Sequence, residues 1–168
     1  MRRRTFLESA VAAGATALAG CSSRLGRNGT VLGRIEVINN SFVSNRIRLI
    51  VTRDEETVLD RLIDLPALTA EDGVPVTVVP PTWPAVRGEY TVRALHYGED
   101  GDRESQTWAH TFTRADYEDY YPDDREDPGC LAAVVKIGSL AETADAPIGI
   151  GPTYVDAPCD PTPADGSR

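Results

Sequence analysis

Few side chains in this sequence could do catalytic or metal chemistry, and their spacing argues against both. The chain has two histidines, His96 and His110, and it lacks the common serine-hydrolase, phosphate-loop, dithiol and zinc-protease signatures. We expect a hairpin turning at residues 98–102, with Ala94 opposite Trp108 and Val92 opposite His110. His96 then lies roughly 13 Å from His110, too far for both to bind one metal ion. The sequence therefore predicts a protein that is not an enzyme.

An acidic segment, residues 116–128, is the one local feature with a candidate chemical use. It contains seven carboxylates and three tyrosines in thirteen residues. Calcium takes roughly six to eight oxygen ligands, so calcium is the one cofactor we consider, although the spacing matches no calcium-loop signature. The alternatives are a solvated acidic loop, or a loop whose exposed aromatic rings contact a partner. The candidate metal- or partner-binding residues are Asp119, Asp123, Asp124, Asp127, Tyr117, Tyr120 and Tyr121.

The N-terminus has the organisation of a targeting segment. Three consecutive arginines at positions 2–4 precede an apolar stretch of eleven residues at positions 10–20. As a helix this stretch would span roughly 16 Å, about half of a hydrocarbon core, so it is too short to anchor the chain. We therefore predict that residues 1–20 are a signal peptide and not part of the fold.

Two motifs in this segment resemble known export signals. Arg3 and Arg4, followed by Thr-Phe-Leu, resemble the twin-arginine signal family. The sequence Leu-Ala-Gly-Cys, which ends at Cys21, resembles the lipobox of bacterial and archaeal lipoproteins. Together these resemblances imply cleavage before Cys21, lipidation of its thiol, and a mature protein anchored through the lipid at the extracytoplasmic face of the membrane. The alternative is a plain cleaved signal, with Cys21 in a disulfide.

The charge of the chain excludes several classes of partner. Seventeen basic and 26 acidic residues give a net charge of −9; removing residues 1–20 takes away three arginines and one glutamate, which leaves −11. The acidic excess and the single lysine, Lys136, resemble proteins of salt-loving microbes, in which a dense carboxylate surface stays hydrated in concentrated salt. This composition argues against binding to nucleic acid and to an anionic membrane surface.

The remaining modification candidates depend on the exported setting. With Cys21 set aside, Cys130 and Cys159 form an even pair, which in an oxidising environment predicts one disulfide closing a loop of about 30 residues; two free thiols are the alternative. Asn28 and Asn39 begin glycosylation sequons, so each is a candidate glycan acceptor.

Short alternating runs indicate strands in one domain. We divide the chain into the signal peptide, a lipidated tether at 21–30, a domain at 31–156 and a disordered tail at 157–168 that is rich in proline. Apolar and polar residues alternate with a period of two, and turn residues separate the runs, which is typical of a sandwich or barrel. The predicted strands cover residues 31–37, 46–52, 58–63, 74–78, 89–94, 107–112, 131–137 and 148–155, with a helix at 115–120.

The run from Gly88 to Ala94 resembles the penultimate strand of immunoglobulin-like domains. In that family a tyrosine enters the strand and its hydroxyl bonds back to the preceding corner, the place that Tyr90 takes here. The resemblance implies an immunoglobulin-like antiparallel β-sandwich of about seven or eight strands. The paired core cysteines of antibody domains are absent, and the strands after Phe112 exceed the minimal fold.

These observations favour a non-catalytic function. We expect a tethered binding or assembly module of the cell envelope whose loops contact an envelope protein or a glycan. The alternatives are a calcium-stabilised structural domain or a solute-binding protein. An exported enzyme ranks last, because the sequence offers no cluster of histidine, serine and carboxylate groups that could form a catalytic site.

Overall fold

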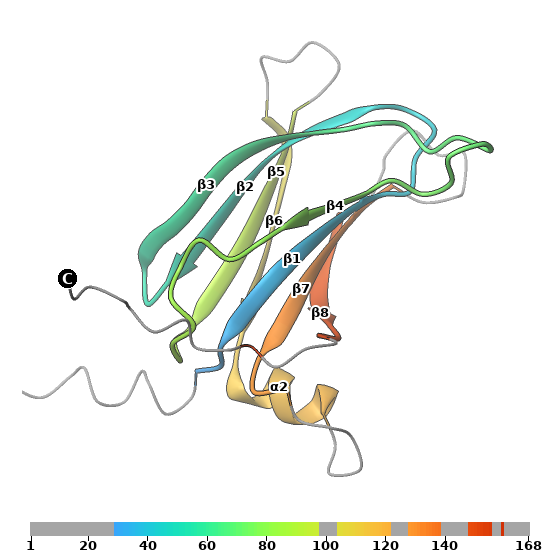
Figure 1. Cartoon of the computed structure of the whole chain (residues 1–168). Helices are drawn as coiled ribbons and strands as arrows, with labels where there is room; N and C mark the ends of the chain where they lie inside the picture. The colour runs from blue at the N-terminus through green and yellow to red at the C-terminus, as the bar shows by residue number, and fades with distance from the viewer. Residues whose placement is uncertain (1–28, 98–103, 122–127, 139–147, 156–158, 160–168) are drawn as a thin grey trace, which may run out of the picture.

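The computed structural model describes residues 29–97, 104–121, 128–138, 148–155 and 159 (Figure 1). They form eight strands and one short helix. Several predicted residues lie outside the described part of the chain: Arg3, Arg4, Cys21, Asn28, Asp123, Asp124, Asp127 and the tail beyond 159. No helix in the described part of the chain has the length and apolar character of a membrane span. The elements are β1 (Leu32–Asn39), β2 (Asn45–Arg53), β3 (Glu56–Leu65), β4 (Val76–Val79), β5 (Tyr90–Tyr97), β6 (Glu104–Phe112), α2 (Arg114–Tyr120), β7 (Leu131–Ile137) and β8 (Ile148–Thr153).

The strands form two four-stranded sheets packed face to face, which confirms the predicted all-β sandwich (Figure 1). One sheet has the order β3-β2-β5-β6 with antiparallel neighbours throughout. The other has the order β4-β1-β7-β8. In this second sheet β1 and β7 run parallel, so the expectation of purely antiparallel pairing was wrong at this one ladder.

The strand order explains how an immunoglobulin-like arrangement accommodates the extra strands. The first sheet matches the C′-C-F-G order of a variable-type domain, and β4 beside β1 matches E beside B. Strand A of an immunoglobulin domain lies beside B at the start of the chain. Here β7, which comes after the F and G equivalents, lies beside β1 instead.

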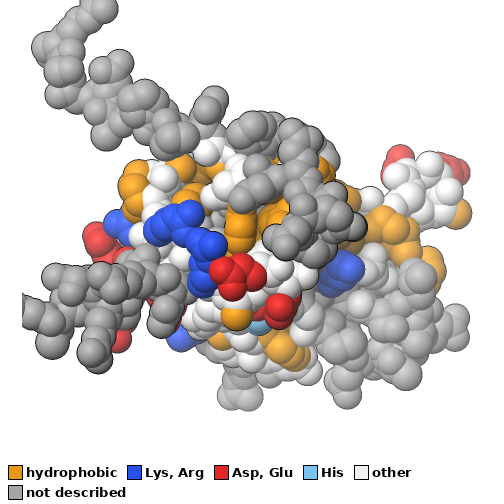
Figure 2. Space-filling view, turned by 90° about the horizontal axis from the view of Figure 1, so that it is seen from below, with side chains coloured by type: hydrophobic (Ala, Val, Ile, Leu, Met, Phe, Trp, Pro, Cys, Tyr) orange, Lys and Arg blue, Asp and Glu red, His pale blue; other side chains and the backbone are white. Residues whose placement is uncertain are grey.

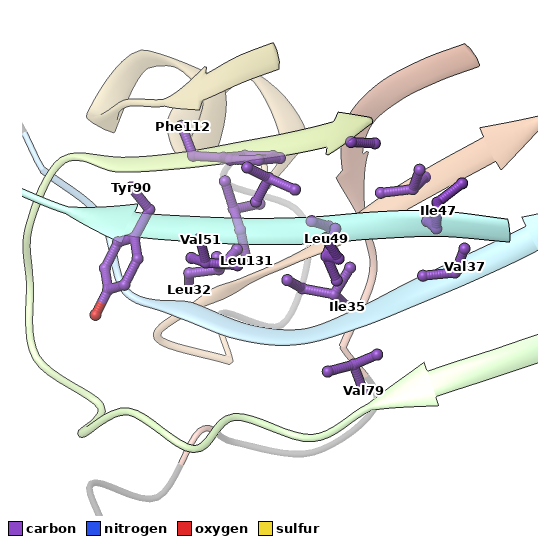
Figure 3. Packing of buried hydrophobic residues seen from close by; sticks show 14 of the residues in the cluster. Leu32, Ile35, Val37, Ile47, Leu49, Val51, Val79, Tyr90, Phe112 and Leu131 are labelled. Carbon is purple, nitrogen blue, oxygen red and sulfur yellow. The ribbon is translucent and has the colours of Figure 1, made fainter. Parts of the chain in front are cut away.

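The core lies between the two sheets and consists of the inward residues of the alternating runs (Figure 3). Successive side chains of a strand point to opposite faces of the sheet, so every second one packs against the opposite sheet and is removed from water. The largest fully buried side chains come from β1, β2, β3, β5, β6 and β7: Leu32, Ile35, Ile47, Leu49, Leu65, Tyr90, Phe112, Leu131 and Ile137.

A tyrosine corner closes one end of this core, as the resemblance implied. The Tyr90 hydroxyl donates to the carbonyl oxygen of Val86 at 2.9 Å. The Trp83 ring packs at a centroid distance of 6.4 Å from Tyr90, and its indole nitrogen donates to the Leu32 carbonyl oxygen at 2.9 Å. Burial, the largest effect, raises the pKa of the Tyr90 phenol, so the hydroxyl keeps its proton and remains a donor.

The alternating valines of β4 lie on the side of the strand that faces solvent, not on the side that faces the core as their pattern suggests. Val74, Val76 and Val78 alternate, but they are exposed, while Val79 is buried. In the register Val79 lies opposite the fully buried Ile35. The period of two in this run correctly predicts a strand, but the apolar set faces solvent.

A disulfide joins Cys130, just before β7, to Cys159 near the end of the described chain. It lies over the outer side of β1 at Gly33, where β1 and β7 shift register. A Cβ atom at Gly33 would lie 2.9 Å from the Cys159 sulfur and 3.3 Å from the Leu131 carbonyl oxygen. Gly33 therefore provides the space in which the disulfide packs.

We predict that Gly33→Ala destabilises the oxidised protein. The added methyl group must displace the disulfide or the backbone of β7, and overpacking of this kind costs roughly 1–3 kcal/mol. The loss should appear as a lower midpoint of urea unfolding. In a Cys130→Ala/Cys159→Ala background the nearest atom is gone, so the same substitution should cost less. Gly149→Ala is the matched control, because a Cβ there meets no atom within 4 Å. An equal cost in both backgrounds would contradict this account.

Candidate binding surface

The two histidines lie apart, as the predicted hairpin required. The register places Ala94 opposite Trp108 and Val92 opposite His110, and it pairs His96 with Gln106. Each imidazole has its own partner, since His96 Nε2 bonds to Asn45 Oδ1 at 2.7 Å and His110 Nε2 lies 3.3 Å from Asp116 Oδ1. Among the described residues no group of three histidine, cysteine or carboxylate side chains could hold a metal ion.

Asp116, the first carboxylate of the acidic segment, caps a helix. Its Oδ2 atom accepts hydrogen bonds of 2.7 Å from both the backbone nitrogen and the hydroxyl of Thr113, which forms a capping box at the start of α2. Burial acts to raise the pKa of Asp116, but the bonds from Thr113 and the proximity of His110 outweigh it, so the pKa lies below its usual value. The chemistry of this carboxylate is therefore structural.

The tyrosines of the acidic segment mainly complete the core instead of forming an exposed aromatic surface. Tyr117 and Tyr121 are buried, and Tyr120 is partly buried against the same cluster. The Tyr121 hydroxyl accepts a hydrogen bond of 3.2 Å from the backbone nitrogen of Val155, and its ring packs 5.2 Å from that of Tyr117. The interpretation of these rings as exposed partner contacts was wrong for Tyr117 and Tyr121, and Tyr120 is only partly exposed. Asp119 is exposed on α2.

Asn39, a candidate glycan acceptor, has no accessible side-chain nitrogen in the folded domain. The residue is fully buried at the end of β1. Its Nδ2 atom donates to the carbonyl oxygens of Val43 at 2.9 Å and Pro66 at 2.7 Å. Its Oδ1 atom accepts from the backbone nitrogen and the hydroxyl of Ser41. The structure therefore contradicts the expectation of a glycan here in the folded protein, because both amide atoms are engaged inside it.

The same amide belongs to a network that shapes the loop between β1 and β2, residues 40–44. Asn45, buried at the start of β2, donates to Asn39 Oδ1 at 3.1 Å, to the Ser41 hydroxyl at 2.8 Å and to the Val43 carbonyl oxygen at 3.1 Å. The side-chain oxygen of Asn45, Oδ1, forms a hydrogen bond with His96 Nε2 on β5. Three side chains thus converge on the Val43 carbonyl group and fix the backbone of a five-residue loop.

This fixed loop presents two large apolar side chains to solvent. Phe42 is 64% exposed and Val43 is 55% exposed. Residues 39–45 contain no charged side chain, in a sequence of which 26% is charged. A loop that buries its polar groups and exposes its apolar ones reverses the usual pattern of surface loops.

Strand β4 and the residues just before it add three exposed valines next to this loop. The backbone nitrogen of Asn39 donates to the Pro75 carbonyl oxygen, and the backbone nitrogen of Leu68 donates to the Ser41 carbonyl oxygen, so the two segments are joined. The loop lies at the end of the sandwich away from α2 (Figure 1), and β4 runs back along β1 from there, with Val76 opposite Ile38 and Val78 opposite Glu36. We call the exposed set of Phe42, Val43, Val74, Val76 and Val78 the tip surface.

The chain enters the domain at the other end. Thr30 and Gly88 exchange backbone hydrogen bonds of 3.1 and 3.0 Å, and Gly29 pairs with Thr113 just before α2. Figure 2 looks at the molecule from this side, where hydrophobic, basic and acidic side chains are interspersed. Since β1 runs from this end to the loop at 40–44, its eight residues separate Phe42 and Val43 from the entry point by about 26 Å, while Val78 lies opposite Glu36, partway along β1.

Sequence reasoning missed the tip surface for two reasons. The tetrapeptide Asn-Ser-Phe-Val at 40–43 gave no periodic signal, and the hydrogen bonds that shape it involve His96 and Pro66, far along the chain. The alternation of valines in β4 predicts a strand but does not say which of its two faces meets the core. The available signal was the absence of charge over residues 39–45.

We predict that Asn45→Ala lowers the free energy of unfolding by about 2–3 kcal/mol, because it leaves buried partners of the loop network without hydrogen bonds. Urea unfolding at neutral pH measures this loss. The matched control is Asn40→Ala, whose side chain makes no hydrogen bond with the described residues. A cost for Asn45→Ala no larger than that of the control would contradict a structural role for the network.

We also predict a pH dependence from His96. Burial lowers its pKa below the usual 6.5, so the unfolded chain takes up this proton more readily than the folded one. The contribution of neutral His96 to stability is therefore present above about pH 6.5 and is lost as the pH falls through the lower folded value. As the pH falls from about 7.5 to 5, the free energy of unfolding should decrease more for wild type than for His96→Gln. Parallel curves of unfolding free energy against pH would contradict it.

Comparison with known proteins finds no family model that matches the chain, and no curated protein matches it either.

Proposed function

We propose that this protein is a lipoprotein tethered at the extracytoplasmic face of the membrane, where it acts as a non-catalytic binding or assembly module of the cell envelope. The observation that carries this proposal is that the chain enters the domain at Gly29, while the loop that exposes Phe42 and Val43 lies at the opposite end. A lipid on Cys21 would therefore leave this loop facing away from the bilayer.

The short tether strengthens this proposal. Eight peptide steps separate Cys21 from Gly29, so the anchor lies at most about 28 Å from the first paired residue. The sandwich itself adds about 26 Å along β1 before the loop begins. An anchored domain that stands upright on this tether would carry its apolar loop tens of ångströms from the membrane, within reach of other envelope components.

The chemistry of the described side chains supports binding over catalysis. Each histidine has a structural partner, and Asp116 serves a helix cap. The tyrosines fill the core. The unusual feature that remains is an apolar surface on a fixed loop, and such surfaces on soluble domains mark sites of interaction.

The tether is tested with the full-length chain in cells that have twin-arginine export and lipoprotein processing. Wild type should fractionate with membranes and carry lipid, whereas Cys21→Ser should be released in soluble form because the thiol that accepts the lipid is gone. Cys159→Ser is the control for losing a cysteine elsewhere and should stay with the membranes. Arg3→Lys/Arg4→Lys should remain unprocessed in the cytoplasm. Membrane retention of Cys21→Ser would contradict the proposal.

A further inference from the structure

We propose that the tip surface is the docking site for a protein that lies farther from the membrane than this domain and offers an apolar pocket with a basic rim. This inference rests on the proposed tether for its orientation. It goes beyond the proposed function by naming the surface, its central residue and the chemistry of the partner.

The apolar exposure of the domain is concentrated at this surface. Seven large hydrophobic side chains are exposed among the described residues, and five of them belong to the loop at 40–44 or to β4 and the residues just before it. The other two, Leu62 and Val86, lie on different elements. Single exposed hydrophobic residues are ordinary on a protein surface, but a cluster of them on adjoining segments indicates a binding site.

The loop is also preorganised for binding. Asn39 and Asn45 are buried to hold it, and their side chains fix the Val43 carbonyl group from two directions. A side chain on a backbone that is already ordered loses less entropy on binding than one on a mobile loop. Phe42, with the largest side chain and the greatest exposure of the set, is the natural anchor for a pocket.

Charges beside the surface indicate the rim of the partner. Glu71 and Asp72 lie exposed in the turn closed by the Thr69–Gly73 bridge, on the segment that Leu68 joins to the loop. Neither carboxylate forms a salt bridge with the described residues, whereas residues 39–45 are uncharged. A partner surface complementary to this one has an apolar pocket that receives Phe42 and, at the border of the pocket, basic residues that pair with Glu71 and Asp72.

Other occupants fit less well. An anionic lipid surface would be repelled by a mature chain of net charge −11, and the loop at 40–44 lies at the far end from the anchor. A second copy joined edge to edge through β4 would have only four residues to pair, because Pro75 and Pro80 flank the strand. Two copies standing upright on one membrane would also point their loops the same way, which disfavours a head-to-head contact between the loops.

The experiment places a photo-crosslinking phenylalanine analogue at position 42 of the full-length, tethered protein in intact cells. The matched control carries the analogue at position 62 on β3, since Leu62 is 59% exposed and Phe42 is 64% exposed. We expect one protein species to crosslink at position 42 and not at position 62. That species is then purified, and its affinity for the lipid-free domain is measured.

Phe42→Ser should weaken that affinity by about tenfold or more, and Leu62→Ser should change it less than about twofold. Both variants should melt within about 3 °C of wild type, because the substituted side chains are exposed. A Glu71→Gln/Asp72→Asn variant should lower the association rate and weaken its dependence on salt.

Several outcomes would overturn the inference. Crosslinks at position 42 to lipid, to a second copy of this chain or to no protein would each do so, as would equal capture at position 62. Unchanged affinity of Phe42→Ser in a correctly melting protein would do so as well. These failures are separate from failure of the tether, which the membrane fractionation of Cys21→Ser reports independently.

Discussion

Asn39 ends β1 with a fully buried amide, and a buried amide must have both of its polar atoms paired because water cannot reach them. Its partners come from three places: the following loop, the start of β2 and Pro66 after β3. One side chain thereby links both sheets at this end of the sandwich. The shape of the loop, and therefore the exposure of Phe42, follows from satisfying this one group.

The sheet edges show how the domain keeps other strands away while leaving one apolar region uncovered. On the edge strand β3, Arg61 lies opposite the buried Leu49 and yet stays exposed, so a charge occupies the core-facing side of the edge. The outer side of β3 bears Asp60, which pairs with Arg48. Edge strand β4 is short and flanked by prolines. These features discourage strand addition, so the exposed valines of β4 offer side chains to a partner instead of an open backbone.

Local pattern predicted much of the fold, and long-range choices account for the rest. Alternating or apolar runs located all eight strands, and the hairpin between β5 and β6 had the expected register because a short connection fixes it. The same alternation predicts that a strand has two different faces but does not say which one meets the core. Val76 is an example, because it is apolar and yet faces solvent. The parallel partner of β1 and the buried positions of Tyr117 and Tyr121 depend on segments far apart in sequence, which no local pattern encodes.

The parallel pairing of β1 with β7 also determines the order in which the domain can be assembled. About a hundred residues separate these neighbours, and β1 lies between β4 and β7 in its sheet. Closing so long a loop is entropically costly and makes folding slow. While the chain is being synthesised, β1 has at most one of its two neighbours until residue 131 has emerged. The β3-β2-β5-β6 sheet has all of its strands earlier, so it can serve as the surface on which the second sheet is completed.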